Sequence, residues 1–274
     1  MADRSLSPLE ARVVLSLESE GGEEISLAGI RGRARVSAGH ARKLAHDLVR
    51  KRWLQRVGRG RYLLNPSRHG PQAIADTDPF RVGSRVATPY YFGYSTAAEL
   101  LGLLPQASRV YFIVTTARGG VPPHAAEFRR VRIAQSGFFG TQEVYRRGTR
   151  LIISDPERTV LDCLARPEFC GGIGGAVRVL ESAGRRIDWP RIVGYLERLG
   201  NRSLARRLGY LAETFTKGRA IPERWARRMI ARAGEPYAPL GPATEFGRRG
   251  PHDSRWHLIR NVPEAVLRAE VDLR

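Results

Sequence analysis

The stretch from residue 37 to residue 66 joins a helical pattern to a hairpin pattern, and it constrains the fold more than any other part of the sequence. Ser37 precedes apolar residues at helical spacing, which predicts a capped helix with one buried face. Its expected buried residues are Ala41, Leu44, Ala45, Leu48 and Val49. Residues 53–57 and 61–66 predict two short strands, and Gly58-Arg59-Gly60 between them predicts the turn of a hairpin.

Two further helices are expected before this stretch. Residues 8–19 show helical spacing after Ser7, a suitable cap, and Gly21 with Gly22 ends the pattern. Ser26 can cap a short second helix, and residues 32–36 are the expected turn. Three helices followed by a basic hairpin predict a winged helix-turn-helix, in which the third helix enters the major groove of DNA.

The charge distribution agrees with a nucleic-acid partner. The net charge is +19, from 46 basic and 27 acidic residues. Residues 31–68 hold twelve arginines and lysines against one acid, Asp47. Excess charge of one sign is what phosphate neutralisation requires. Arginine-rich usage also follows from a GC-rich coding sequence, so charge alone leaves that alternative open.

The side chains expected to touch DNA lie at the start of the third helix and on the hairpin. Arg42 is the first choice for a base contact to guanine, because outward residues near the N-terminus of such a helix reach base edges. The hairpin arginines are expected on phosphates or in the minor groove. The alternative for each residue is a solvated surface side chain. The predicted DNA-binding residues are Arg35, Ser37, His40, Arg42, Lys43, Arg56, Arg59 and Arg61.

Residues 65–79 are rich in Pro and Gly and predict a domain boundary, with a DNA-binding domain at 1–68 and a larger domain at 80–274. The larger domain is expected to mix helices and strands, which gives an α+β fold class. A helix capped by Ser95 or Thr96 should stop at Gly102. Strands are expected at 109–115, 128–133, 144–146 and 151–154, helices at 156–164, 173–183, 189–199, 203–215 and 222–232, and strands near 256–259 that return to the sheet.

Asp155 and Glu157 form the one carboxylate cluster in the sequence that resembles a catalytic metal site. A metal-dependent nuclease needs two carboxylates and a nearby lysine, but the larger domain holds only Lys217. Asp155 followed by Pro156 is typical of a helix cap, and this is the favoured interpretation. The Gly-rich residues 171–175 lack the residues of a phosphate loop and predict a turn between helices. The sequence therefore predicts a protein that is not an enzyme and has no metal or cofactor.

The cysteine content and the lack of a long apolar stretch indicate the cellular compartment. Cys163 and Cys170 have no second pair or nearby histidine, which favours two free thiols over a disulfide or a zinc site. No stretch has the roughly 20 apolar residues that a bilayer span requires. We therefore expect a cytoplasmic protein without a membrane partner.

Several segments are specific in their combination: Lys51-Arg52-Trp53-Leu54 with residues 58–62, residues 91–103, residues 153–159 with 161–164, Pro167-Glu168 with residues 171–173, and residues 207–211. Together they resemble the AbiEi-type antitoxins, a family of transcriptional regulators paired with nucleotidyltransferase toxins in abortive infection. The resemblance implies an antitoxin with two functions. Its winged helix would repress its own operon by binding promoter repeats, and its larger domain would neutralise a cognate nucleotidyltransferase toxin.

Two alternatives stay open beside the antitoxin and autorepressor. The first is a winged-helix repressor that responds to a small ligand, with the aromatic residues 90–94 lining a pocket. The second is an enzyme acting on DNA, with a metal on Asp155 and Glu157. Basic pairs in the larger domain, Arg146-Arg147, Arg206-Arg207 and Arg227-Arg228, could serve toxin neutralisation or extend the DNA footprint. The oligomeric state is not decided by any heptad pattern.

Overall fold

The computed structural model describes residues 4–70, 78–105, 109–119, 127–184, 186–216, 221–231 and 236–269. The chain divides into two compact units. Unit 1 contains residues 1–88 and 117–130, and unit 2 contains residues 89–116 and 131–274. The domain limits 1–68 and 80–274 stay a prediction, and part of the expected boundary, residues 71–77, lies outside the described residues.

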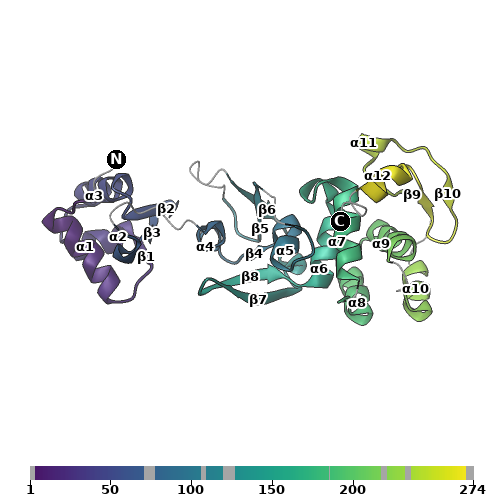
Figure 1. The fold of residues 1–274 in the computed structure, drawn as a ribbon, viewed down its shortest axis with the longest axis horizontal. Coiled ribbons are helices and arrows are strands. Elements are labelled where there is room, and N and C mark those ends of the chain that lie inside the picture. The colour runs from purple at the N-terminus through teal and green to yellow at the C-terminus, as the bar shows by residue number, and fades with distance from the viewer. Residues whose placement is uncertain are drawn as a thin grey trace. The chain divides into compact units, whose positions relative to one another are not determined.

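Unit 1 combines short helices with three short strands (Figure 1). In chain order they are α1 (Pro8–Ser19), β1 (Glu24–Ser26), α2 (Leu27–Ala34), α3 (Ala38–Arg50), β2 (Leu54–Gly58), β3 (Arg61–Leu64), the 3-10 turn η1 (Ser67–His69) and α4 (Pro79–Gly83). The three strands form an antiparallel sheet in the order β1-β3-β2. The core of this unit lies between the first three helices and the sheet, and Val13, Ile30, Leu48 and Trp53 are among its buried residues.

The sequence predicted the three helices of unit 1 through their caps. Ser7 and Glu10 form a reciprocal capping box at α1, and Ser26 and Ser37 accept hydrogen bonds from the first turns of α2 and α3. Two details differ. Helix α2 extends to Ala34, so the turn that follows it is shorter than the predicted turn at 32–36. Strand β1 was not predicted, because its three residues are too few to show an alternating pattern.

Unit 2 combines a sheet with a group of helices. Its elements are β4 (Tyr91–Phe92), α5 (Tyr94–Leu100), β5 (Tyr111–Thr115), β6 (Phe128–Arg132), η3 (Gln135–Gly137), β7 (Thr141–Arg146), β8 (Thr149–Ser154), α6 (Pro156–Ala165), η4 (Pro167–Phe169), α7 (Gly172–Ala183), α8 (Trp189–Leu199), α9 (Arg202–Phe215), α10 (Glu223–Ile230), β9 (Ala238–Pro239), α11 (Ala243–Phe246), β10 (His252–Asp253), β11 (Leu258–Ile259) and α12 (Glu264–Ala269). The main sheet has five strands in the order β6-β5-β4-β8-β7.

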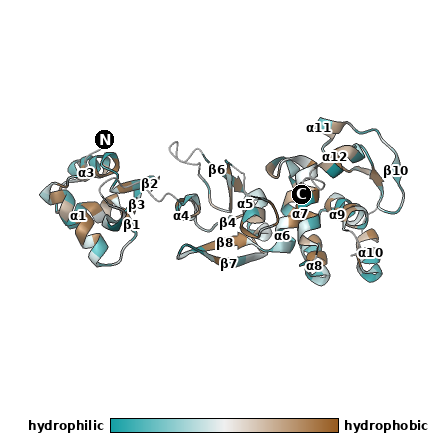
Figure 2. Cartoon of the chain, viewed as in Figure 1, coloured by the Kyte–Doolittle hydropathy of each residue, from teal (hydrophilic) through white to brown (hydrophobic). Residues whose placement is uncertain are grey.

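Helix α7 lies at the centre of the hydrophobic core of unit 2. Figure 2 colours it mainly as hydrophobic, and its residues Ile173, Val177 and Leu180 are almost fully buried. Helices α6, α9 and α12 pack against it. The chain is therefore a mixed α and β protein, and the predicted helices and strands of the larger domain are found within a few residues of their expected limits.

Three expectations for the larger domain were wrong. The late strands do not return to the main sheet, because β11 pairs with β10 and β9 in a separate three-stranded sheet. Helix α5 is not capped by Ser95 or Thr96. Gly93 precedes it, and the Thr96 hydroxyl instead accepts a hydrogen bond from the Phe112 backbone N–H at 2.8 Å.

The third error concerns the glycines at 171–175, which are not a turn between helices. Only Gly171 precedes α7, and the others form its first turn. A Cβ at Gly175 would lie 1.8 Å from the carbonyl oxygen of Cys170. The helix needs glycine at this position because the backbone before it passes so close.

Candidate nucleic-acid interface and the buried carboxylate cluster

Helix α3 exposes one side of its first two turns to solvent. The Ser37 hydroxyl accepts a hydrogen bond from the His40 backbone N–H at 3.3 Å and so begins the helix. Ala41, Leu44, Ala45 and Leu48 are buried, as the sequence predicted, whereas Val49 is half-buried. The helical period then places His40, Arg42 and Lys43 on the exposed side.

The C-terminal end of α3 sets the direction in which the backbone enters the hairpin. Arg52 adopts a left-handed conformation with φ of 62°. The Trp53 backbone N–H donates to the Leu48 carbonyl oxygen at 2.8 Å, and the Arg52 N–H donates to Val49 at 3.0 Å, a Schellman motif. The Trp53 indole N–H donates to the Arg4 carbonyl oxygen at 2.9 Å, and the Arg4 guanidinium covers the indole ring. This packing fixes the direction in which β2 leaves the helix.

The hairpin β2–β3 carries two exposed arginines and one paired arginine. Arg56 and Arg59 are exposed, and Arg59 lies in the turn beside Gly60, whose φ is +67°. Arg61 is half-buried, and its Nε lies 2.6 Å from Glu24 Oε1 on the neighbouring strand β1. Arg61 is therefore engaged by an acid of its own unit, which the sequence pattern did not show.

The acids of unit 1 pair with basic residues other than those at the start of α3. Glu10 binds Lys51, Glu20 binds Arg33, Asp47 binds Arg50 and Glu24 binds Arg61. Within the described part of the chain, no acid pairs with Arg42 or Lys43. No described acid therefore neutralises the positive charges of Arg42 and Lys43 on the outer face of α3.

Seven of the eight predicted DNA-binding residues are exposed in unit 1. Arg35 ends α2, Ser37, His40, Arg42 and Lys43 lie at the start of α3, and Arg56 and Arg59 lie on the hairpin. Arg61 is the exception. Their contacts with DNA stay a prediction.

The carboxylates of the Asp155 cluster are structural contacts inside unit 2. Asp155 Oδ1 accepts from the Arg158 backbone N–H at 2.7 Å and caps α6, and its Oδ2 accepts from the Tyr195 hydroxyl at 2.7 Å. Glu157 Oε1 accepts from the Asp188 backbone N–H at 2.8 Å, next to the start of α8. The two acids thus join α6 to α8, which supports the interpretation of Asp155 as a cap.

A buried ion pair lies within α6. Arg158 Nε donates to Asp162 Oδ1 at 2.8 Å, and both side chains are almost fully buried. The guanidinium also donates to the Gly137 carbonyl oxygen at 2.8 Å and stacks over the Phe139 ring. Burial opposes the charge on Arg158, but the Asp162 carboxylate outweighs it and raises the pKa of the guanidinium. Arg158 therefore anchors the loop before β7 to α6.

No group of three or more His, Cys, Asp or Glu side chains that could hold a metal ion is found among the described residues. Lys217, the lysine considered for the nuclease alternative, lies outside them. Cys163 and Cys170 are both buried, and their sulfur atoms lie 2.6 Å apart as free thiols. Burial raises the pKa of the Cys163 thiol, so it stays protonated.

The aromatic residues 90–94 belong mainly to the core. Tyr91, Phe92 and Tyr94 are buried, and the Tyr94 ring packs edge-on against Phe112 and Phe169. Burial raises the pKa of Tyr91 and of Tyr94 well above the ordinary tyrosine value. A cavity of about 330 Å³ in unit 2 lies elsewhere, between α8, α9 and α10. The observation that suggested a ligand pocket is thus accounted for by packing.

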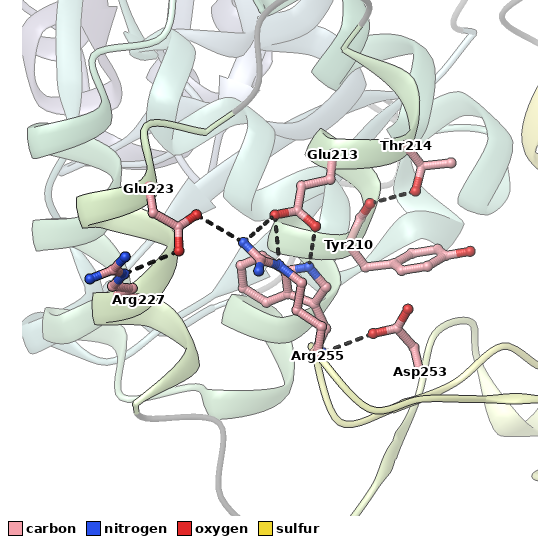
Figure 3. Close-up of polar contacts among 8 residues, drawn as sticks. Tyr210, Glu213, Thr214, Glu223, Arg227, Asp253 and Arg255 are labelled. Carbon is pink, nitrogen blue, oxygen red and sulfur yellow. Dashed lines mark hydrogen bonds and ion pairs between the residues drawn. The ribbon is translucent and has the colours of Figure 1, made fainter.

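The motif at 207–211 is explained by Trp256. The indole ring lies directly on Gly209, where an added Cβ would be 2.1 Å from a ring carbon. The indole N–H donates to Glu213 at 2.8 Å. Figure 3 shows how Arg255 bridges Glu213 on α9 and Glu223 on α10. Glycine at position 209 of α9 therefore leaves room for the ring of Trp256, which lies between β10 and β11 in the sequence.

One of the basic pairs noted in the sequence, Arg206-Arg207, differs from expectation, whereas Arg227 and Arg228 are exposed. Arg206 is buried and donates to the Pro236 carbonyl oxygen at 2.5 Å. Arg207 is half-buried and donates to the Leu164 carbonyl oxygen. Both guanidiniums hold backbone carbonyls in place, so this pair is not basic surface. Arg227 and Arg228 are paired with Glu223 and Glu197.

Comparison with known proteins identifies the larger part of unit 2. Residues 91–214, from β4 into α9, match the family model of the AbiEi antitoxin C-terminal domain. The crystal structure of the RV2827C protein from Mycobacterium tuberculosis has a similar fold, with a TM-score of 0.69 and 19% sequence identity over 98% of this chain and 96% of that one. No curated protein matches the sequence. No described helix has the length and apolar character needed to cross a membrane.

The family match contains most of the segments on which the sequence resemblance depended, including the Asp155 cluster and the Gly209 motif. It supports a toxin–antitoxin role for the chain. The predicted resemblance is confirmed for residues 91–214, which match the C-terminal domain of the AbiEi antitoxins.

Proposed function

We propose that the chain is an antitoxin that also represses transcription of its own operon, with unit 1 as a winged helix-turn-helix that binds promoter repeats. The observation that carries this proposal is the element order of unit 1. Helices α1, α2 and α3 precede the hairpin β2–β3, and β1 pairs with β3, which is the order and pairing of a winged helix.

The charge of unit 1 supports DNA as the partner. Arg42 and Lys43 lie exposed on the outer face of α3, and Arg56 and Arg59 lie exposed on the hairpin. Helix α3 would enter the major groove, with Arg42 contacting a base edge, and the hairpin arginines would contact phosphates. Arg61 has a smaller role in this proposal because Glu24 already binds it.

The second activity, neutralisation of a cognate nucleotidyltransferase toxin, is proposed for unit 2 on the basis of the family match. Asp155 and Glu157 are buried and bound to polar groups of the same unit, which supports a structural role for both carboxylates rather than a catalytic one. We likewise propose a cytoplasmic location, where operon DNA and toxin are both present.

The test is a gel shift and hydroxyl-radical footprint of the full chain on the DNA upstream of its own gene, at two salt concentrations. We expect a protected repeat and an affinity that falls steeply with salt. Arg42→Ala is the matched variant, and Arg268→Ala, an exposed arginine paired within α12, is the control. The proposal is supported if Arg42→Ala loses the protected repeat and Arg268→Ala keeps it. The absence of any specific footprint with the full chain contradicts autorepression.

Toxin neutralisation is tested separately by co-expression. The nucleotidyltransferase gene that this proposal expects next to the chain's own gene is induced in cells with and without the chain, and growth is measured. Rescue of growth by the full chain and by its Arg42→Ala variant is expected. Growth arrest that the chain does not relieve contradicts the antitoxin function.

A further inference from the structure

Helices α8, α9 and α10 of unit 2 border a cavity of about 330 Å³ that opens to solvent. The three helices pack against one another, and Figure 1 shows them in the same group of helices. Small-molecule sites in proteins are usually clefts of roughly 300 to 1,000 Å³. The cavity therefore has room for a ligand at the lower end of that range.

The floor of the cavity is apolar. Each of the three helices contributes to it, and the side chains that form it are buried by their packing in unit 2. A floor that is already packed needs little ordering when a ligand binds, which favours binding of an apolar group. The residues of the floor are Val193 and Leu196 of α8, Ala205 of α9 and Met229 of α10.

The turn between α8 and α9 places two polar residues at the cavity. Gly200 ends α8 with φ of 64°, and its backbone N–H donates to the Leu196 carbonyl oxygen at 3.0 Å. Asn201 Oδ1 accepts from the Leu204 backbone N–H at 3.0 Å and begins α9. Because only two residues separate the helices, Asn201 and Arg202 both line the cavity beside the apolar floor.

The charged residues that line the cavity are two arginines and one acid. Glu197 Oε1 accepts from Arg228 Nε at 2.6 Å, and this ion pair joins α8 to α10. Arg202 is exposed, and no acid pairs with it in the part of the chain that the structure describes. The lining therefore has a positive charge at Arg202, and the Asn201 amide group, whose oxygen caps α9, has N–H groups to donate.

An apolar floor beside an unpaired arginine suits one class of small molecule, an organic acid with a hydrocarbon chain. The chain would be removed from water by the floor, and the carboxylate would accept charge-assisted hydrogen bonds from the guanidinium. A cationic ligand would be repelled by Arg202. A neutral hydrocarbon would gain nothing from the arginine or the amide.

We propose that the cavity between α8, α9 and α10 binds a small organic acid, with its apolar chain against Leu196 and Met229 and its carboxylate at Arg202 and Asn201. This site goes beyond the proposed function, because neither DNA nor a toxin takes part in the binding. It also differs from the aromatic residues 90–94, which belong to the core.

Met229 provides a direct reporter, because the sequence contains only two methionines, Met1 and Met229. The full chain is labelled with ¹³C at the methionine methyl groups, and Met229→Leu assigns the Met229 signal. Octanoate is the probe, and it is titrated to millimolar concentration. Acetate, which lacks the chain, and 1-octanol, which lacks the charge, are titrated in the same way. We expect a saturable shift of the Met229 signal with octanoate, no shift with acetate, and weaker binding of 1-octanol.

The contribution of the arginine is tested with Arg202→Ala, which changes an exposed residue in the first turn of α9. We expect octanoate to bind this variant about three- to tenfold more weakly, as loss of a partly solvated charged hydrogen bond requires. Arg224→Ala is the matched control. It removes an exposed arginine of α10 that is not among the lining residues, and it should bind octanoate as the wild type does.

A Met229 signal that does not move with octanoate overturns the proposal. Binding of 1-octanol as tight as that of octanoate, or wild-type affinity of Arg202→Ala, overturns the assignment of an acid to this cavity. Equal losses in Arg202→Ala and Arg224→Ala also overturn it, because they indicate a general effect of net charge. These measurements contain no DNA and no toxin, so their outcome is independent of repression and neutralisation.

Discussion

At the scale of single residues, buried charged side chains and exposed ones have different roles. Arg158 and Asp162 are buried together and hold a loop to α6. Arg42 and Lys43 are exposed, and no described acid pairs with them. The first group should affect stability when changed, and the second should affect only binding, because solvent already compensates an exposed charge.

Arg42 and Arg59 should differ in what they contribute to DNA binding. Arg42→Ala should reduce discrimination between operator and random duplexes by about 1 to 3 kcal/mol, because a base contact is lost. Arg59→Ala should weaken both duplexes alike and lower the salt slope by about one, as expected of a phosphate contact. Competition binding at two salt concentrations measures both. Equal losses on the two duplexes for Arg42→Ala would show that another residue contacts the bases.

Asp162→Asn should destabilise unit 2 by about 3 kcal/mol or more, because it leaves the Arg158 charge buried without its counter-ion. Glu168→Gln is the control. Its pair with Arg166 is about half exposed on both sides and should be worth about 0.5 kcal/mol or less. Urea denaturation of the two variants provides the measurement. Similar losses in the two variants would mean that the buried pair is not structurally important.

At the scale of elements, helix ends carry much of the information in unit 1. Ser7, Ser26 and Ser37 begin its three helices, and the Schellman motif at Arg52 ends α3. A cap is local, so a sequence pattern can show it. The conformation of Arg52 is also local, but arginine gives no sign of it, since a left-handed conformation is normally the place of glycine.

Arg52→Gly should stabilise unit 1 by about 1 kcal/mol, because glycine adopts the left-handed conformation without the strain of a side chain. Arg50→Gly, two residues earlier and inside α3, should destabilise it by about the same amount. Hydrogen exchange of the α3 backbone amides reports both changes. A loss of protection in Arg52→Gly would indicate that the arginine side chain itself holds the helix end.

Glu10 should make unit 1 sensitive to acid. Burial opposes its charge, but hydrogen bonds from Lys51 and from the Ser7 backbone and hydroxyl outweigh burial and lower the pKa of the carboxyl. A lowered pKa stabilises the folded state above the unfolded value of about 4.3 and loses this effect as the pH falls through the folded value. Wild type should therefore exceed Glu10→Gln in stability at pH 6, and the difference should shrink towards pH 3.

Hydrogen exchange of α1 and α3, corrected for the intrinsic rate at each pH, measures this difference. Glu20→Gln serves as the control, because Glu20 is more exposed and binds Arg33 on the outside of α2. A difference between wild type and Glu10→Gln that is the same at both pH values would exclude the proposed linkage.

At the scale of the whole molecule, the two hydrophobic cores found among the described residues have no residue in common. Each unit therefore has the buried apolar surface on which independent stability depends. This separation suits a protein with two proposed activities, since a change in the exposed face of α3 leaves the packing of α6 and α7 untouched.

Toxin neutralisation and repression should therefore be separable. A variant with Arg42→Ala and Lys43→Ala should lose operator binding by at least tenfold and should still restore growth in cells that express the toxin. Asp162→Asn should reduce neutralisation by unfolding unit 2. Growth curves and a promoter reporter in the same cells measure the two activities. Loss of neutralisation in the α3 variant would show that the activities are coupled.

The sequence by itself determined the local features: the caps of the first three helices, the buried stripe of α3, the hairpin after it, and the segments that identify the AbiEi family. These depend on residues close together in the chain, whose spacing is visible in the sequence. Tertiary structure decided the rest. It bound Arg61 to Glu24, buried Arg206, placed Trp256 on Gly209 and put the last strands in a separate sheet. Each of these joins residues that are distant in sequence, and only the packed chain brings such partners together.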